Sequence, residues 1–226
     1  ALEWLEKSAE LKNTYAEYQM AKHILADPSA KPEQTRQVVG WLTHAAEAGL
    51  DCAQYALGKL YRDGGPVVQD MAQAVIWFSQ AAERGNQYAM YALGKLRLEA
   101  DDPAAARRWF QQSADLGNQF AQYRLGKLLL CGDGVAKDTA GAVRWLTESA
   151  EQGNQYAQYA LGKLYLLGKD IPQDRESAVR WFTLAAEQGN EYARYFLDHM
   201  NDSPSLFASA TRLLHHMGRI FQEQAP

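Results

Sequence analysis

Small and apolar residues recur along this chain at the spacing of an amphipathic helix. One helical face is formed, at three- and four-residue intervals, by Ala142, Trp145, Leu146, Ser149 and Ala150. Further along, Ala157, Leu161 and Leu164 form a second apolar stripe of the same kind. The pattern predicts two consecutive helices, each of which buries one face against a neighbour.

This pair of helices returns about every 36 residues. Tryptophans mark it at Trp4, Trp41, Trp77, Trp109, Trp145 and Trp181, which are 37, 36, 32, 36 and 36 residues apart. A block such as WFTLAAEQGN contains the tryptophan, and a block such as QYAQYALGKLY follows it. A repeat of this kind indicates hairpins that bury their apolar faces by stacking. We name the tryptophan-bearing helix of each repeat helix A and the next one helix B.

Polar residues and glycines mark the helix ends. Helices A are preceded by Asp70, Asp102, Asp138 and Asp174, which suit N-caps, and are followed by Gly49, Gly85, Gly117, Gly153 and Gly189, which suit C-terminal caps. We therefore expect helices at about residues 70–84 and 87–98, and equivalently in later repeats. The connection in EADDPAAA is four residues shorter than its counterparts. We expect this deletion to tighten one loop without ending the array.

A glycine interrupts the middle of helix B in successive repeats, at Gly58, Gly94, Gly126 and Gly162. Glycine inside a helix costs about 1 kcal/mol relative to alanine. Its return at one position predicts a close helix crossing that a Cβ atom would obstruct.

Together these residues resemble the Sel-one-like repeat, a relative of the tetratricopeptide repeat with longer loops. The shared features are the small-residue pair after W-[FL], the G-N-x-x-A step, the L-G-x-[LY] block and the G-x-G-V-x-x-D loop. That loop is clearest at Gly132, Gly134, Val135 and Asp138. The resemblance covers residues 1–200. It implies an all-α, right-handed superhelical solenoid of about six helix hairpins that holds other proteins together.

The two ends of the chain differ from the repeats. Ser203 suits an N-cap, Pro204 a first helical turn, and the residues up to Phe221 are amphipathic. We expect a helix at 203–224 that caps the array of residues 1–200. Because Trp4 arrives with almost no helix before it, we also expect the chain to be part of a longer polypeptide.

A narrower resemblance concerns the QYALGKLYL blocks and the tail SATRLLHHMGRIFQEQ. They are similar to the C-terminal region of mobilisation relaxases of the MobA/MobL type in Gram-positive bacteria. Those relaxases nick DNA with an N-terminal domain that needs a metal-binding histidine cluster and a nucleophilic tyrosine, and this sequence contains no such domain. The resemblance implies an accessory repeat region of a conjugative DNA-transfer protein.

Composition and charge argue against several classes of protein, among them membrane-spanning proteins and proteins held to nucleic acid by their overall charge. The 226 residues are 47% hydrophobic and 22% charged, with a net charge of −4, so bulk positive charge does not hold this chain to nucleic acid. No apolar run reaches the roughly 18 residues of a membrane span, and the N-terminal residues do not form a signal peptide. Cys52 and Cys131 lie two repeats apart, too far for a disulfide. We expect free thiols and a cytoplasmic location.

Residue patterns for catalysis or metal binding are missing. The histidines are His23, His44, His199, His215 and His216, and no two have the i, i+4 spacing of a helical zinc pair. Cys52 falls in a column that is aromatic in the other repeats, which favours packing, and we expect Cys131 in a loop. The sequence therefore predicts no enzymatic activity, no metal and no cofactor.

Helices B carry tyrosine and lysine at i and i+4, in Tyr18/Lys22, Tyr55/Lys59, Tyr91/Lys95, Tyr123/Lys127 and Tyr159/Lys163. A row of lysines beside aromatic rings is able to hold single-stranded nucleic acid. Alternatively, each tyrosine packs between helices while the lysine stem covers it. The pair occurs in nearly every repeat, which favours packing.

The residue before the tryptophan of helix A varies between repeats: Gly40, Ile76, Arg108, Arg144 and Arg180. Helical spacing places it on the side away from the tryptophan, and in related superhelices helices A line the concave surface. We expect a ladder of Arg108, Arg144 and Arg180 about 10 Å apart, flanked by Gln112, Glu148 and Leu184. Guanidinium groups suit carboxylates and phosphates. A solvated charge row is the alternative.

The leading interpretation is a monomeric scaffold that binds a protein or peptide, acidic in character, on its concave face. The runner-up is an accessory region that binds nucleic acid through the tyrosine, lysine and arginine rows. An enzyme ranks third, and a membrane partner is not expected.

Overall fold

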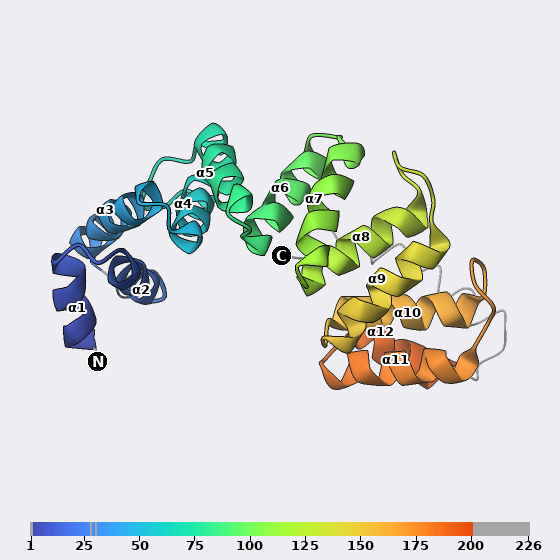
Figure 1. Cartoon of the computed structure of the whole chain (residues 1–226). Coiled ribbons are helices and arrows are strands. Elements are labelled where there is room, and N and C mark those ends of the chain that lie inside the picture. Colours follow the sequence, from blue (N-terminus) through green and yellow to red (C-terminus); the bar gives the residue numbers. More distant parts are fainter. Residues whose placement is uncertain (1, 28, 30, 201–226) are drawn as a thin grey trace. The chain divides into compact units, whose positions relative to one another are not determined.

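The computed structural model describes residues 2–27, 29 and 31–200, and every regular element in this part of the chain is an α-helix (Figure 1). Its twelve helices are α1 (Leu2–Glu10), α2 (Thr14–Leu25), α3 (Pro32–Glu47), α4 (Asp51–Asp63), α5 (Met71–Glu83), α6 (Gln87–Glu99), α7 (Pro103–Asp115), α8 (Gln119–Cys131), α9 (Thr139–Glu151), α10 (Gln155–Leu167), α11 (Arg175–Glu187) and α12 (Glu191–His199). The odd-numbered helices are helices A and the even-numbered ones helices B. The helices predicted at 70–84 and 87–98 are confirmed, while the capping helix predicted at 203–224 lies outside the described residues.

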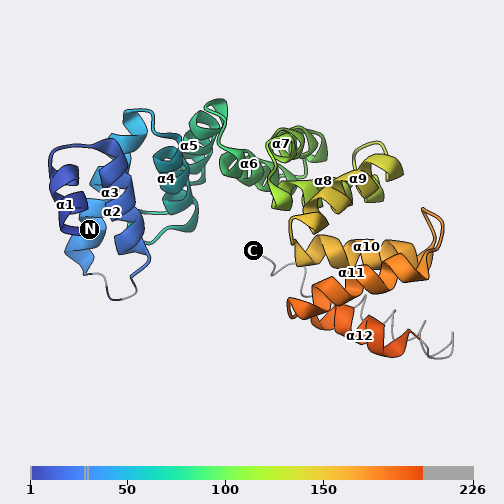
Figure 2. The same cartoon turned by 60° about the horizontal axis from the view of Figure 1, so that its bottom comes forward.

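The chain divides into two compact units, Ala1–Ala121 and Gln122–Pro226, with the boundary inside α8. In the first unit, each helix from α1 to α7 packs against the next, and in the second unit α9 to α12 do the same. Successive helices fold back on one another as hairpins in both units (Figures 1 and 2). The prediction of stacked helix hairpins is thus confirmed within each unit.

The aspartate caps also close the loops between repeats. The side chain of Asp138 accepts a hydrogen bond from the backbone N–H of Gly141, and its own backbone N–H donates to the carbonyl of Leu129 at 3.0 Å. In the short connection, the N–H of Asp102 donates to the carbonyl of Arg97 at 2.8 Å. The same backbone contact therefore closes both the long loop and the loop with the deletion. The expectation that the array continues through the deletion is confirmed.

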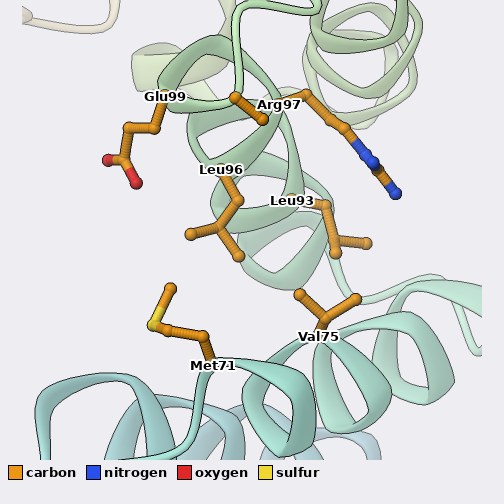
Figure 3. Close-up of a pocket in the computed structure, with 7 residues that line it drawn as sticks. Met71, Val75, Leu93, Leu96, Arg97 and Glu99 are labelled. Carbon is orange, nitrogen blue, oxygen red and sulfur yellow. The ribbon is translucent and has the colours of Figure 1, made fainter.

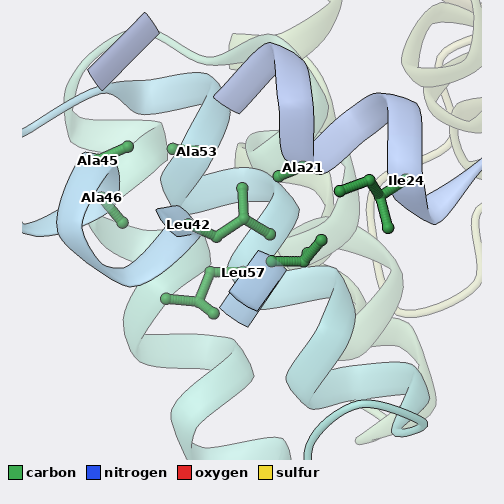
Figure 4. Close-up of a cluster of buried hydrophobic side chains, with 8 residues drawn as sticks. Ala21, Ile24, Leu42, Ala45, Ala46, Ala53 and Leu57 are labelled. Carbon is green, nitrogen blue, oxygen red and sulfur yellow. The ribbon is translucent and has the colours of Figure 1, made fainter. Parts of the chain in front are cut away.

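Each hairpin contributes one layer of the core. A representative layer from α2, α3 and α4 is shown in Figure 4 and consists of Ala21, Ile24, Val38, Leu42, Ala45, Ala46, Ala53 and Leu57. Alanines dominate such layers, so the helix axes can approach one another closely. Gly153, at a φ of 94°, turns the chain from helix A into helix B, as predicted for this capping position.

The glycines inside helices B lie against large side chains of the next helix A. A Cβ atom added at Gly58, Gly94, Gly126 or Gly162 would come within 2.7, 2.5, 2.7 or 2.6 Å of Phe78, Phe110, Leu146 or Phe182, respectively. Real Cβ contacts are not this short, so the predicted close crossing is confirmed. Each hairpin stacks on the next through this contact.

Buried polar side chains form a second contact between repeats. Gln158 is 3% exposed, and its amide donates to the carbonyl of Ala150 at 3.0 Å. Its Oε1 accepts a hydrogen bond of 2.8 Å from the amide of Gln188, which belongs to the next repeat. Gln54 makes the same bond to a helix carbonyl, Ala46, but its buried Oε1 has no hydrogen-bond partner. The equivalent position in the third repeat is the apolar Met90.

The first repeat has a charged version of this contact. Glu17 occupies the position of Gln158, and its side chain is 4% exposed. Its Oε2 lies 2.6 Å from Nδ1 of His44 on α3. A buried carboxylate needs such a partner, because an unpaired charge in the interior is strongly destabilising. The spacing of the histidines along the chain gives no indication of this pair.

The glycine contact predicts opposite effects of one substitution at two helical glycines of the first unit. Gly58→Ala should destabilise the protein by about 1 to 3 kcal/mol, because the methyl group meets Phe78. Gly40→Ala should stabilise it by up to about 1 kcal/mol, because no atom lies within 4 Å of the new Cβ. Thermal unfolding followed by circular dichroism measures both. Equal shifts in the two variants would contradict the crossing role of Gly58.

The glutamine contact predicts a measurable coupling between Gln158 and Gln188. Gln188→Leu should destabilise the protein by about 1 kcal/mol, because it leaves Oε1 of Gln158 buried without a donor. In a Gln158→Met background, the same substitution should cost much less. A double-mutant cycle of urea unfolding measures the coupling free energy. Additive effects would show that the hydrogen bond between Gln188 and Gln158 does not couple the two repeats.

Candidate partner-binding surface

The six candidate residues of the arginine row lie on three helices A. Arg108 and Gln112 are exposed on α7 of the first unit. In the second unit, Arg144 and Glu148 lie on α9, and Arg180 and Leu184 lie on α11. Both of these helices pack against α10, so the second unit by itself presents two arginines from successive repeats. The ladder of three arginines about 10 Å apart stays a prediction.

Helical spacing predicted that the arginines point away from the tryptophans, and this is wrong for Arg144 and Arg180. The guanidinium carbon of Arg144 lies 4.3 Å from the ring centroid of Trp145, and that of Arg180 lies 5.6 Å from the ring of Trp181. Neighbouring Cβ atoms on a helix diverge, but the arginine side chain is long enough to fold back over the indole. A cation over an aromatic face is favourable and holds the guanidinium close to the helix.

The residue one turn after each arginine sets its charge environment. Glu148 lies 3.7 Å from Arg144, with the two side chains 42% and 63% exposed. Glu148 also accepts a 3.3 Å hydrogen bond from Gln122, which in turn accepts one from Gln152. The corresponding residues after Arg108 and Arg180 are Gln112 and Leu184, which cannot form an ion pair.

Arg108 and Arg180 form no ion pair within the part of the chain that the structure describes, although Glu176 lies one turn before Arg180 on α11. Leu184 is 36% exposed beside Arg180 on the same face of α11. The face of α11 therefore combines a positive charge, backed by an indole ring, with an exposed apolar side chain.

In the tyrosine and lysine row on helices B, Lys95, Lys127 and Lys163 are half-buried, whereas Lys22 and Lys59 are exposed like the arginines. The ammonium groups of Lys127 and Lys163 lie 5.7 and 6.0 Å from the rings of Tyr123 and Tyr159. Burial lowers the pKa of both lysines, and burial also raises the pKa of the Tyr159 hydroxyl. These observations favour the packing interpretation of the pairs over a solvent-facing cationic row.

The cysteines lack the features of a catalytic thiol. Burial raises the pKa of the Cys52 thiol, which disfavours the nucleophilic thiolate. Cys131 is exposed, but it is the last residue of α8 and not part of a loop, because the helix ends one residue later than expected. In the described part of the chain, no group of three or more histidine, cysteine and acidic side chains is arranged to hold a metal ion.

No helix among the described residues is both long and apolar enough to cross a membrane.

Sequence reasoning missed the glutamine contacts and the pair of Glu17 and His44. A signal for the glutamine contacts was present, since glutamine returns at one position of helix B, in Gln54, Gln122 and Gln158.

Similarity to known proteins agrees with the repeat architecture. The Sel1 repeat family matches residues 1–13, 53–86, 87–118, 119–154 and 155–190. The crystal structure of a Sel1 repeat protein from Oxalobacter formigenes is 32% identical, with a TM-score of 0.79 over 88% of this chain and 59% of that one. An immunity protein from Pseudomonas aeruginosa is 25% identical, with a TM-score of 0.55 over 84% of this chain and 72% of that one. No curated protein matches this chain.

A Sel1 repeat protein from Klebsiella pneumoniae is 20% identical, with a TM-score of 0.55 over 88% of this chain and 98% of that one, and shares the fold. This chain spans 59% of the length of the Oxalobacter formigenes protein. Sel1 repeats typically serve as scaffolds for protein interactions, and their solenoid is generally a non-catalytic fold. From its sequence blocks, its stacked hairpins and these matches, the chain belongs to the Sel1 repeat family.

Proposed function

We propose that this chain is a scaffold that binds an acidic segment of a protein partner along the exposed face of its helices A. The observation that carries the proposal is the pair of Arg180 and Leu184, an exposed cation that forms no ion pair with any described residue and lies beside an exposed apolar side chain. Arginine binds carboxylates in a bidentate manner. A partner segment that alternates acidic and apolar residues would complement this face.

Differences between the three arginines refine the proposal. At Arg144, a partner carboxylate competes with Glu148 for the guanidinium. At Arg180 no ion pair with a described residue has to be broken, and Leu184 offers an apolar contact. The proposed binding strength therefore rises from α9 to α11 within the second unit. In the first unit, Arg108 beside the neutral Gln112 offers a partner carboxylate a guanidinium of the same kind.

The biological setting that we propose is the accessory region of a conjugative relaxase, with the nicking chemistry in another part of that protein. Only the sequence supports it, because the tail SATRLLHHMGRIFQEQ lies outside the described residues. The binding proposal does not depend on this setting.

The proposal predicts opposite effects of two charge changes. Arg108, Arg144 and Arg180 replaced together by Glu should abolish binding of a fluorescein-labelled peptide that alternates Glu and Leu. Each exposed ion pair is worth up to about 1 kcal/mol, so the three together account for roughly 100-fold in affinity. Glu148→Gln should instead tighten binding, by up to about fivefold, because the competitor of the partner carboxylate is removed. Fluorescence anisotropy measures the dissociation constants, and circular dichroism checks that the helices persist.

The lysine row provides the control. Lys59, Lys95, Lys127 and Lys163 replaced by Gln should leave binding of the acidic peptide nearly unchanged. A labelled single-stranded oligonucleotide tests the alternative function, nucleic-acid binding, whose affinity would fall steeply with salt. Two results together would favour this alternative over the scaffold proposal. The arginine variant would bind the peptide normally, and the lysine variant would lose oligonucleotide binding.

A further inference from the structure

A pocket of about 400 Å³ opens at one end of the hairpin of α5 and α6, within the first unit (Figure 3). Met71 and Val75 on α5 face Leu93 and Leu96 on α6 across it. Met71 is exposed, whereas Leu93 is 2% exposed at the base of the pocket. Such an apolar lining next to solvent is unfavourable unless another group covers it.

The remaining lining residues are charged or small and stand at the end of α6: Arg97, Glu99 and Ala100. The side chains of Arg97 and Glu99 point to opposite sides in Figure 3 and leave the apolar walls open between them. The charges therefore form a rim and do not fill the pocket.

The other repeats of this chain show what usually stands in the position of Arg97. The equivalent residues are Tyr61 on α4, Leu129 on α8 and Tyr165 on α10. Tyr61 packs against both the cluster around Leu42 and the cluster around Phe78. Tyr165 packs in the same manner against two successive clusters. In these repeats, an apolar side chain at the end of helix B joins the core of its own hairpin to the next core.

Backbone hydrogen bonds fix this equivalence independently of the sequence alignment. The carbonyl of Tyr61 accepts from the N–H of the capping Asp70, and the carbonyl of Tyr165 accepts from Asp174. The carbonyl of Arg97 accepts in the same way from Asp102. The backbone of Arg97 is therefore held as in the other repeats, and only its side chain fails to pack.

The shortened connection removes a second apolar residue from the same place. Three residues before the capping aspartate, the long loops carry Val67, Val135 and Ile171, all of them half-buried. The short connection has no counterpart of these apolar residues, because the deletion falls between the end of α6 at Glu99 and the capping Asp102. At this repeat an apolar residue of helix B is thus replaced by Arg97, and the apolar residue of the loop is missing.

We propose that this pocket is a docking site for one tyrosine side chain of a protein partner, separate from the arginine row. The partner residue covers the core of the hairpin of α5 and α6, as Tyr61 and Tyr165 pack against the cores of their own hairpins. Its ring contacts Leu93, Leu96 and Val75, and its hydroxyl stays at the rim near the charged groups of Arg97 and Glu99. Tyrosine suits such a half-open site because its ring is apolar and its outer end is polar.

The phenol p-cresol, which is the tyrosine side chain alone, tests the site without a known partner. Protein with 13C-labelled methyl groups is titrated with p-cresol and followed by NMR. Saturable shifts should concentrate on the methyl signals of Met71, Val75, Leu93 and Leu96, with a dissociation constant on the order of 1 to 10 mM, as expected for so small a ligand. Leu161, the counterpart of Leu93 in a repeat that carries its own tyrosine, is the internal reference and should not shift.

Arg97→Tyr restores the residue found in the other repeats and should fill the pocket from within. We expect the p-cresol shifts to disappear and the melting temperature to rise by about 2 to 4 °C as the apolar walls are covered. Arg97→Gln removes the charge without filling the pocket and should keep the shifts. Shifts that survive in Arg97→Tyr, or that spread evenly over methyl groups of both units, would overturn the proposal. Peptide binding to the arginine row should be unaffected by Arg97→Tyr, so failure of one site is distinguishable from failure of the other.

Discussion

The contact between a helix B glycine and a large side chain of the next helix A is the constraint on which the rest of the structure depends. A hairpin of two short helices cannot bury both of its apolar faces by itself. Stacking hairpins solves this only if the helices approach closely, and at Gly162 the ring of Phe182 takes the space of a missing Cβ. The helix-propensity cost of the glycines in α4, α6, α8 and α10 is offset by the packing that the missing side chain permits.

Once this contact fixes the stacking, the remaining positions of the repeat are free to vary, and their variation carries the function. The column of Gln54 and Gln158 is occupied by Glu17 in one repeat and by Met90 in another. Each of these residues makes a different contact in the interior: the glutamines form hydrogen bonds through their side-chain amides, Glu17 contacts the imidazole of His44, and Met90 packs as an apolar side chain. The arginine row varies in the same way, so successive repeats share a backbone while presenting different chemistry.

Hairpin order, helix boundaries and the glycine crossing could be predicted from the sequence, because each is a local pattern that recurs in every repeat. The position of the Arg144 guanidinium could not, because helical spacing places Cβ atoms and says little about a long, flexible side chain that folds back onto Trp145. The pair of Glu17 and His44 escaped prediction for a different reason. It joins residues 27 positions apart and occurs in one repeat only, so periodicity gives no signal for it.

Both proposed binding features arise where one repeat lacks a contact that the others make within the chain. Arg144 has Glu148 beside it, whereas Arg180 has Leu184 and forms no ion pair with any described residue. Likewise, Tyr165 joins two core clusters, whereas Arg97 leaves an open pocket. The hydrogen bond from Asp102 preserves the backbone at this point, so the loss of apolar groups does not propagate along the array. A repeat protein can therefore acquire a binding site by losing an internal contact. The neighbouring repeats hold the backbone in place, and the side chain that has lost its internal contact is available to a partner.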